Sequence, residues 1–263
     1  MKNILVTGAG GGMGSATCRL LIEKGYNVWG LDRCQKETID GLHFIQTDIT
    51  DEAAVSAAFE QVSKEIDRLD AVIHMAGLYD LNSLVEMPEQ AFLNIFNVNL
   101  FGVYRINRIF MPLIKEGSRI IITSSELAPL DPLPFNGIYS VTKAALEKYA
   151  FSLRMELNLL GVKVSVIRPG AVKTGLLSAS TRALDSFCQS TKLYQCNAKR
   201  FKGIVDSVEA KNIPAQSIAK IAYKAMTSRR PKYIYNINRN PLLRLLNLLP
   251  DRMQVAVIKM IIK

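Results

Sequence analysis

Short apolar runs that resemble buried strands alternate with longer helix-like segments along most of this chain. Runs that are apolar throughout are typical of parallel strands buried on both faces. Right-handed crossovers through the intervening helices then give an open, doubly wound α/β sheet of about seven strands with helices on both faces. The runs predicted as strands are KNILVT (2–7), YNVWGLD (26–32), LHFIQTD (42–48), DAVIHMAG (70–77), SRIIITSS (118–125), VKVSVIRPG (162–170) and KYIYNI (232–237).

Segments with helical spacing follow the predicted strands. We expect helices over 14–25, over 50–66 with Thr50 as the N-cap, over about 89–115, from 137 to about 160, and over 215–228. Between 171 and 214 no period is clear, and we expect an irregular segment there, of the kind that often serves as a lid. The chain is therefore predicted to hold one domain over 1–237 and a basic, apolar C-terminal extension over 238–263.

The 263-residue chain has a net charge of +10, and the whole excess lies in its last quarter. Up to Thr191 there are 18 Lys and Arg against 20 Asp and Glu, whereas from Lys192 onward there are 15 against 3. Such a split suggests an anionic partner, either a membrane or a nucleic acid, or a solvated basic face. We predict no nucleic-acid binding, because leucines dilute the basic residues of the tail and no aromatic residues are interleaved with them.

The cysteines indicate neither a disulfide framework nor a metal site. Cys18, Cys34, Cys188 and Cys196 form no CxxC pair, and only two histidines are present to complete a zinc site. The apolar run at the N-terminus is too short for a signal peptide, and no window reaches the ~18 apolar residues of a spanning helix. We expect an intracellular, cytoplasmic protein with reduced thiols.

A glycine-rich stretch, TGAGGGMG over 7–14, lies between the first predicted strand and the first predicted helix. Glycines let the backbone turn sharply and approach a pyrophosphate closely, and the helix N-terminus then offers free N–H groups. Gly8, Gly12 and Gly14 have the spacing T-G-x-x-x-G-x-G. The position of this stretch, after a strand and before a helix, predicts a dinucleotide-binding turn.

Asp32 ends the second predicted strand, where a carboxylate can accept hydrogen bonds from the adenosine ribose hydroxyls and would repel a 2′-phosphate. Arg33 follows it and could pair with a 2′-phosphate instead. Gly11 stands at a position that is often basic in NADP-binding turns. We therefore predict NAD as the preferred cofactor, with NADP as the alternative, and Asp48 as a contact to the adenine edge or an ordinary turn residue.

Five motifs follow one another in a familiar order: TGAGGGMG, NVNLFG, IITSS, YSVTK and RPGAVKT. On these motifs the chain resembles the short-chain dehydrogenases/reductases of the Tyr-x-x-x-Lys type. The resemblance is close over roughly 1–174 and in outline over 214–237. It implies a single Rossmann-like sheet, an oxidoreductase that transfers a hydride between NAD(H) and a secondary alcohol or ketone, and a dimer or tetramer.

The resemblance assigns roles to Tyr139 and Lys143, which lie one helical turn apart. Tyr139 is the implied general acid/base, and a nearby ammonium should lower the pKa of its phenol from ~10. Lys143 is also implied to hold the ribose hydroxyls of the nicotinamide half. Asn99, in NVNLFG, is implied to kink its helix and hold a water that links Lys143 to solvent.

Ser125 is the implied residue that orients the substrate oxygen. It precedes Tyr139 by fourteen residues, where the family has about thirteen, so Ser124 remains a competitor for the role and the loop ELAPLDPLPFNG is one residue longer. Two further departures are Glu126 beside the site, and Met75 where the family often has an asparagine amide. We interpret His74 as a structural residue at a strand end.

The candidate residues divide into two sets. The catalytic set is Ser125, Tyr139, Lys143 and Asn99. The cofactor-binding set is Gly8, Gly12, Met13, Gly14, Asp32, Arg33, Asp48, Ile49, Ala76, Gly77, Tyr139, Lys143, Pro169, Gly170, Val172 and Thr174.

The resemblance implies that the segment over about 175–213 is the substrate lid. This predicted lid is rich in large apolar residues, which suits a hydrophobic substrate such as a sterol, a retinoid or a lipid-like compound. Core packing of the lid would give the same composition. A silent dinucleotide-binding sensor or scaffold is the alternative function, although such a protein would need only the glycines and Asp32. The apolar lid residues are Leu176, Leu177, Leu184, Phe187, Leu193, Tyr194 and Phe201.

The tail over 240–263 is apolar and basic with almost no acidic residues. Its leucines are too dense for a solvated helix. It should either lie in a membrane interface with its basic residues toward lipid phosphates, or pack on a partner subunit. We favour peripheral membrane contact, because the charge excess collects here.

Overall fold

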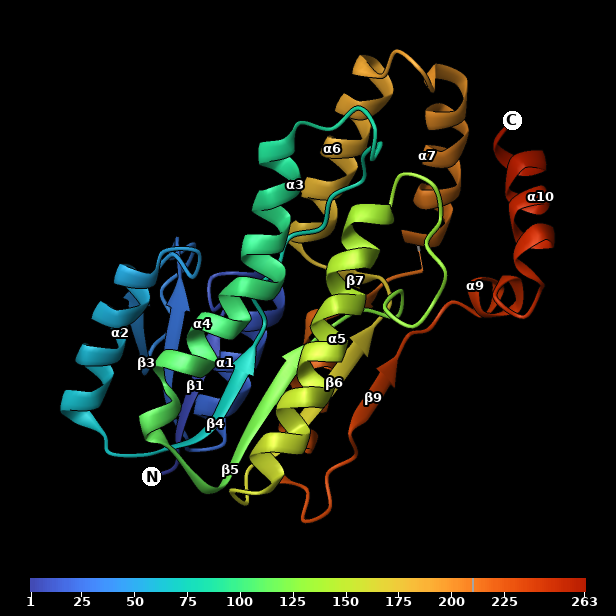
Figure 1. The fold of residues 1–263 in the computed structure, drawn as a ribbon. Coiled ribbons are helices and arrows are strands. Elements are labelled where there is room, and N and C mark those ends of the chain that lie inside the picture. The colour runs from blue at the N-terminus through green and yellow to red at the C-terminus, as the bar shows by residue number, and fades with distance from the viewer. Residues whose placement is uncertain (210) are drawn as a thin grey trace.

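The computed structural model describes the backbone of residues 1–209 and 211–263, and the side chains of these ranges except at 176–180, 182, 208 and 209. At its centre is a seven-stranded sheet in the order β3-β2-β1-β4-β5-β6-β9, in which every neighbouring pair is parallel (Figure 1). The predicted doubly wound α/β fold is therefore confirmed. The strands are β1 (Asn3–Thr7), β2 (Asn27–Asp32), β3 (Leu42–Gln46), β4 (Leu69–His74), β5 (Ile114–Thr123), β6 (Lys163–Pro169) and β9 (Ile234–Ile237).

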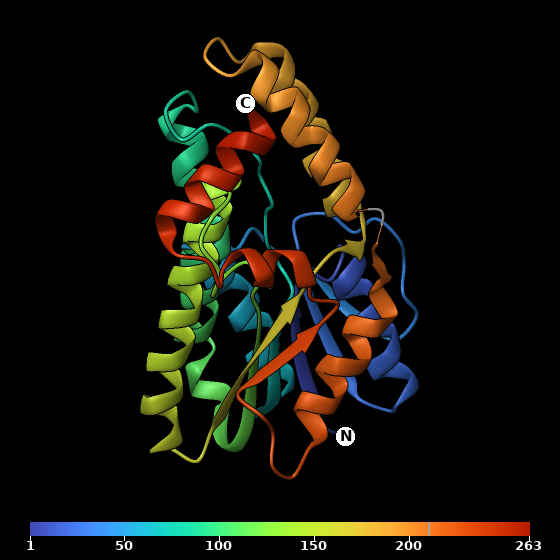
Figure 2. The same cartoon turned by 90° about the vertical axis from the view of Figure 1, so that its right-hand side faces the viewer.

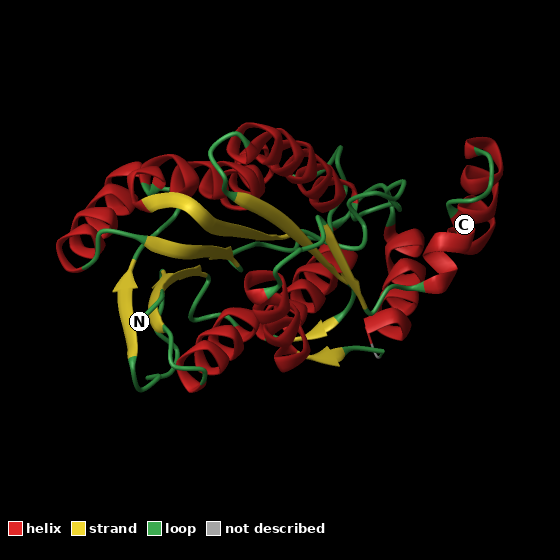
Figure 3. Cartoon of the chain, turned by 90° about the horizontal axis from the view of Figure 1, so that it is seen from below, coloured by secondary structure: helices red, strands yellow, loops and turns green. Residues whose placement is uncertain are grey.

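Helices cover both faces of the sheet, as the view from below shows (Figure 3). On one face, α1 (Gly12–Glu23) and α8 (Ala215–Thr227) pack on alternate strand residues such as Ile4, Val6 and Ile73. On the other face, α2 (Glu52–Glu65), α4 (Gly102–Ile109) and α5 (Gly137–Asn158) pack on the intervening residues, such as Leu5 and Val72. Burial on both faces explains why the strands are apolar throughout.

The strand order reverses between β1 and β4, which pair with each other at the centre of the sheet. Chain segments that leave the carboxyl ends of these two strands turn to opposite faces and leave a crevice between them. The glycine turn after β1 and the segment Ala76–Gly77 after β4 meet at this crevice. The fold thus places the predicted cofactor turn where an open α/β sheet binds ligands.

Two details of the predicted helices were wrong. Asp51, not Thr50, is the N-cap of α2, because the Thr50 hydroxyl donates to Asp48 Oδ1 at 2.7 Å while the Asp51 carboxylate accepts from Ala53 N at 2.9 Å. The long helix predicted over 89–115 is divided into α3 (Glu89–Phe96), a π-helical stretch (Asn97–Phe101) and α4. It ends at Ile109, since Pro112 follows in a short 3-10 turn, and β5 begins at Ile114.

The segment predicted as an irregular lid is instead mostly helical. It forms α6 (Gly175–Ser190) and α7 (Gln195–Glu209), which rise above the carboxyl edge of the sheet (Figure 1). A short parallel pair, β7 (Val172–Lys173) with β8 (Ile213–Pro214), joins their bases. Of the apolar lid residues, Leu184, Phe187 and Phe201 are buried in a separate core cluster, Leu193 is exposed, and the side chains of Leu176 and Leu177 lie outside the described part of the structure.

The last residues form α9 (Pro241–Leu246) and α10 (Asp251–Ile262), which lie beyond the carboxyl edge of the sheet (Figure 2). Polar contacts attach them to the main body: Asp131 N donates to Asn247 Oδ1 at 2.6 Å, and Asn197 Nδ2 donates to Ile262 O at 2.9 Å. That residues 238–263 are a unit apart from the domain stays a prediction. Among the described helices, none is long and apolar enough to cross a membrane.

Candidate active site

The glycine turn after β1 is too crowded for side chains at Gly8, Gly10 and Gly14. Gly8 has φ +73°, and a Cβ built on it would lie 2.5 Å from Ala76 N. A Cβ on Gly14 would lie 1.9 Å from Gly8 O, so α1 begins in direct contact with the turn. The N-terminus of α1 therefore presents bare backbone to the crevice. This close approach fits a dinucleotide pyrophosphate, which such turns bind through backbone N–H groups.

Asp32 lies beside the turn at the end of β2. Its Oδ2 accepts from Gly10 N at 3.0 Å, and its Oδ1 accepts from Cys34 N at 3.1 Å, which fixes the carboxylate at the crevice. Arg33 is largely exposed and lies 4.0 Å from Asp48 Oδ2. Asp48 is further bound by the backbone and hydroxyl of Thr50. The structure brings these three predicted residues together around one edge of the glycine turn.

Ile49 differs from its neighbours, because its side chain is buried in the core near Gly102. A Cβ on Gly102 would lie 2.6 Å from Ile49 Cδ1. Ile49 could therefore reach a cofactor only through its backbone.

Met75 supports the segment after β4 in place of the asparagine expected there. Its Sδ accepts a hydrogen bond from Thr123 Oγ1 at 3.0 Å, and Met75 N donates to Thr7 O at 3.1 Å. These bonds tie β1, β4 and β5 together at their carboxyl ends. Ala76 and Gly77 follow and line the cavity described below.

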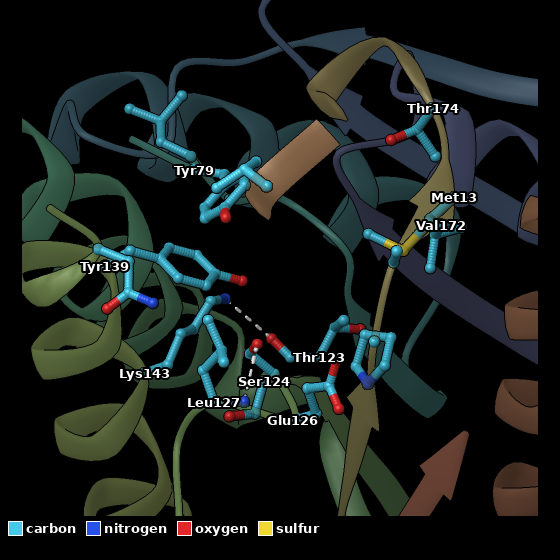
Figure 4. Close-up of a pocket in the computed structure, with 18 of the residues that line it drawn as sticks. Met13, Tyr79, Thr123, Ser124, Glu126, Leu127, Tyr139, Lys143, Val172 and Thr174 are labelled. Carbon is cyan, nitrogen blue, oxygen red and sulfur yellow. Dashed lines mark hydrogen bonds between the residues drawn. The ribbon is translucent and has the colours of Figure 1, made fainter. Parts of the chain in front are cut away.

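Tyr139 and Lys143 both project from the first turns of α5 into the same cavity (Figure 4). Both are buried, and Lys143 Nζ lies 5.7 Å from the centre of the Tyr139 ring. Lys143 Nζ donates to Thr123 O at 3.1 Å. Tyr79 packs edge-on against Tyr139, with ring centres 4.6 Å apart, and holds the phenol in place from above.

The pKa of Tyr139 is shifted in the direction opposite to that expected from the sequence. Burial, and then the negative charge of Glu126, raises it to about 12, although the hydrogen bond with Ser125 opposes the shift. Burial also lowers the pKa of Lys143 to about 8, with Glu147 acting in the other direction. Desolvation outweighs the neighbouring charge because the phenol and the ammonium are both enclosed by protein. At pH 7 the phenol is therefore protonated and the ammonium is charged.

Ser125, rather than Ser124, contacts the phenol. Hydrogen bonding to Ser125 lowers the pKa of the Tyr139 phenol, and Ser125 Oγ accepts from Leu127 N at 3.2 Å. Ser124 is fixed by its backbone, since Ser124 N donates to Ile167 O at 2.8 Å, and its buried hydroxyl has no partner among the described residues. The longer loop before α5 thus leaves Ser125 within reach of Tyr139.

Asn99 lies in the π-helical stretch between α3 and α4 and is fully buried. Its Oδ1 accepts from Leu78 N at 2.7 Å, and its Nδ2 donates to Leu78 O at 2.9 Å and to Thr142 Oγ1 at 3.0 Å. The amide therefore fastens the strand-end segment to α5 next to Lys143. Its part in a water relay stays a prediction.

Glu126 connects the site to the C-terminal extension. It is buried, and its Oε2 accepts from Asn240 N at 2.6 Å. Burial raises the pKa of this carboxyl, while the bond from Asn240 and the charge of Arg239 oppose the shift. This unexpected acidic residue therefore anchors the start of the extension beside Ser125.

The remaining predicted residues close the far side of the site. Glu126 N donates to Pro169 O at 2.9 Å, and Gly170 N donates to Ile237 O at 2.9 Å. Thr174 is the N-cap residue of α6 and lies against the glycine turn, because a Cβ on Gly12 would be 2.9 Å from Thr174 Cγ2. Met13, Val172 and Thr174 face Tyr139 across the cavity (Figure 4).

His74 does not belong to this site. Its Nε2 is 2.9 Å from Asn107 Oδ1, and burial lowers its pKa to about 4. It is thus a neutral, hydrogen-bonded residue at the end of β4, as the sequence suggested.

One cavity of about 1130 Å³, counting the open space at its mouth, unites these residues. It runs from Met13 and Thr174 at the glycine turn to Ser125 and Tyr139. Phe201, one of the predicted lid residues, lines another wall together with apolar residues that the sequence analysis did not indicate: Leu78, Tyr79, Leu133, Ile204, Val205 and Leu243. The apolar period of α7, with Ala198, Phe201 and Val205 on one face, could have indicated part of this wall.

Comparison with known proteins agrees with this geometry. The family model described as short chain dehydrogenase matches residues 2–185. A 3-ketodihydrosphingosine reductase from Bacteroides thetaiotaomicron is 29% identical over 227 residues, which cover 80% of this chain and 84% of the relative. An NADPH-dependent 3-dehydrocapnine reductase from Ornithobacterium rhinotracheale is 26% identical and covers 96% of this chain and 94% of the relative. A solved short-chain dehydrogenase from Streptomyces avermitilis has a TM-score of 0.76 at 21% identity, over 98% of this chain and 95% of that structure, which shows the shared fold.

Proposed function

Because this chain belongs to the short-chain dehydrogenase/reductase family, we propose that it transfers a hydride between NAD(H) and the ketone or secondary alcohol of a hydrophobic, lipid-like substrate. Members of the family are NAD(P)-dependent oxidoreductases that act on alcohol and ketone groups, and this chain is one of them. The observation that best supports the proposal is the placement of a protonated Tyr139, with Ser125 and a charged Lys143, on an apolar cavity that begins at the glycine turn.

Each residue of the site has a separate role in ketone reduction. The dinucleotide, when bound, supplies the hydride. Ser125 hydrogen-bonds the ketone oxygen and orients it, and Tyr139 donates its phenolic proton to that oxygen. A phenol that is protonated at neutral pH suits this direction. Lys143 supplies positive charge next to the phenol and would hold the ribose hydroxyls of a bound dinucleotide. Asn99 keeps the surrounding segments in place and would hold the water that links Lys143 to solvent.

Asp32 favours NAD over NADP. Two backbone N–H groups fix its carboxylate at the crevice, where it would repel a 2′-phosphate. Arg33 could offset that repulsion, but it is turned toward Asp48. The NADPH dependence named for the Ornithobacterium relative belongs to that protein, and NADP remains the alternative here.

A hydrophobic substrate is supported by the cavity walls. Leu78, Leu133, Phe201 and Leu243 surround the space in front of Tyr139. Relatives named as reductases of 3-ketodihydrosphingosine and of 1-acyldihydroxyacetone phosphate are consistent with a lipid-like ketone. Measuring turnover of sterol, retinoid and acyl-chain ketones would show which of these compounds is the substrate.

We expect the protein to oxidise NADH in the presence of hydrophobic ketones, with kcat/KM about tenfold or more above that for small polar sugars. The physical reason is burial of the substrate carbon skeleton against the apolar walls, at ~25 cal/mol per Å². The measurement is the loss of nicotinamide absorbance with a panel of acyl-chain, steroid and sugar ketones. Turnover confined to sugars or polyols would contradict the proposal.

Repeating this assay with NADPH in place of NADH tests the cofactor preference. We expect kcat/KM with NADH to be about tenfold higher than with NADPH, a difference equivalent to ~1.4 kcal/mol. Asp32→Ser should reduce or reverse this preference, because it removes the charge that repels a 2′-phosphate. Asp131→Ser, in a loop away from the glycine turn, is the matched control and should leave the preference unchanged. Preference for NADPH in the unaltered protein would contradict the cofactor proposal.

We also propose that α9 and α10 contact anionic membranes. Leu242, Leu245 and Leu248 are 68%, 62% and 80% exposed, and Met253 and Met260 are also exposed. The basic residues of the same segment, Arg244, Arg252, Lys259 and Lys263, are exposed beside them. Apolar residues flanked by basic ones suit the interface of an anionic bilayer.

The unaltered protein should sediment with vesicles that contain phosphatidylglycerol, and the double variant Arg244→Glu, Arg252→Glu should bind at least about tenfold more weakly, since each basic residue near the surface contributes ~1 kcal/mol. Lys24→Glu with Lys64→Glu makes the same charge change at exposed sites, one directly after α1 and one on α2, and should leave binding close to normal. Absence of binding by the unaltered protein would reject membrane contact.

A homo-oligomer that pairs through α4 and α5 remains a prediction. Large apolar side chains exposed along these helices support it: Tyr104, Phe151 and Met155, with Phe101 just before α4.

A further inference from the structure

A second apolar groove lies beside the active-site cavity. It runs between the loop 131–137, the segment 83–85 and the helix α10, and encloses about 1820 Å³ including the open space at its mouth. Leu84, Pro134, Phe135, Tyr194, Val255 and Ile258 form most of its walls. None of the residues assigned above to cofactor or catalysis lines it.

The groove and the active-site cavity share a wall. Leu133 lines both. Phe135 lines the groove, and the centre of its ring lies 5.4 Å from that of Phe201, which lines the cavity. Side chains of the loop 131–137 and of α7 therefore lie between the groove and the space in front of Tyr139.

The dividing loop is held in an unfavourable conformation. Phe135 has φ +65°, a region that bulky residues rarely occupy. The rings of Phe187, Tyr194 and Phe201 pack around it, and its carbonyl accepts from Asn82 N at 2.7 Å. Residues persist in such conformations where the surrounding structure enforces them, often at binding sites. This loop is part of the stretch ELAPLDPLPFNG (126–137), which is one residue longer than the family's.

We propose that this groove holds the alkyl chain of the substrate while the ketone lies at Tyr139. The inference rests on the proposed ketone reduction and adds the chemical class of the substrate, which is a ketone with a long unbranched alkyl chain. Because Leu133 lines both spaces, a single molecule that passes over this side chain would occupy both, which favours one long substrate over a separate partner. The exposed Leu84 and Val255 at the rim would be covered by such a chain. Because α10 also belongs to the surface proposed for membrane contact, a chain could enter from the bilayer.

The test compares dodecyl methyl ketone with propyl methyl ketone in variants that fill the groove. Val255→Trp and Leu84→Trp add an indole from opposite walls at exposed positions, which the fold should tolerate. For the long ketone, KM should rise about tenfold or more, since losing burial of two methylenes alone gives that factor. For the short ketone, kcat/KM should stay within about twofold. Met260→Trp adds the same indole to α10 outside the groove and should change neither value.

A binding measurement keeps this inference separate from the proposed activity. Dansylaminoundecanoic acid should fluoresce on binding to the unaltered protein, be displaced by the dodecyl ketone, and bind about tenfold more weakly to Val255→Trp and Leu84→Trp. Normal probe binding and normal KM in both variants would overturn the groove assignment. If neither ketone is reduced but the probe binds in this manner, the groove assignment stands and the ketone reduction fails.

Discussion

Tyr139→Phe is expected to lower kcat/KM for ketone reduction by about a hundredfold to ten-thousandfold, the usual contribution of a positioned general acid. The variant loses only the hydroxyl that donates the proton. The ring remains, with its edge-on contact to Tyr79 at 4.6 Å, so the fold and the cavity should persist. NADH should therefore bind with a dissociation constant within about threefold of normal. Steady-state kinetics and NADH fluorescence titration provide the two measurements.

Tyr149→Phe is the matched control for this prediction. Tyr149 lies on the same helix, and its hydroxyl accepts from Asn107 Nδ2 at 3.1 Å, away from the cavity. Losing that bond should cost ~1 kcal/mol of stability and leave kcat/KM nearly unchanged. Comparable activity of Tyr139→Phe and the unaltered protein would remove Tyr139 from the mechanism. Loss of activity in both variants would point to a disturbed helix.

The sheet and the glycine turn could be predicted because their signals are local. Each strand is a continuous apolar run, and the turn directly follows the first of them. The side-by-side placement of Tyr139 and Lys143 also follows from helical spacing alone. The N-cap of α2 was missed because Thr50 and Asp51 are both good caps, and the choice depends on Asp48, which engages the threonine hydroxyl.

The electrostatics of the site could not be predicted from spacing. A lysine four residues from a tyrosine suggests a lowered phenol pKa, yet the pKa of Tyr139 is raised to about 12. Burial is the main cause, and it depends on loops that reach the site only in the folded chain. The roles of Glu126 and Leu243 were hidden for the same reason: one binds Asn240 and the other lines the cavity from the last helices.

The helical lid was missed for a different reason. Polar and basic residues interrupt α7, so its apolar positions stand out only as Ala198, Phe201 and Val205 on one face. Tertiary packing on Phe135 and Leu184 buries that face and stabilises the helix.

Gly14→Ala is expected to weaken NADH binding by about a hundredfold, comparable to the loss of one or two charge-assisted hydrogen bonds. The added Cβ would lie 1.9 Å from Gly8 O and 2.6 Å from Gly8 C, so backbone must move to admit it. Overpacking of this kind costs ~1–3 kcal/mol, and the melting temperature should fall accordingly. Isothermal titration with NADH and thermal melts with and without NADH provide the measurements.

Gly203→Ala distinguishes this crowding from a general effect of replacing glycine. Gly203 lies in α7 with nothing within 4 Å of a built Cβ, so the same methyl group should leave NADH affinity unchanged. In a helix interior the change should even raise stability by up to ~1 kcal/mol. If Gly14→Ala instead binds NADH normally and melts normally, α1 does not approach the turn as closely as described. The backbone N–H groups at its N-terminus would then not be the anion-binding element, and the dinucleotide would have to be held chiefly by Asp32, Lys143 and the segment after β6.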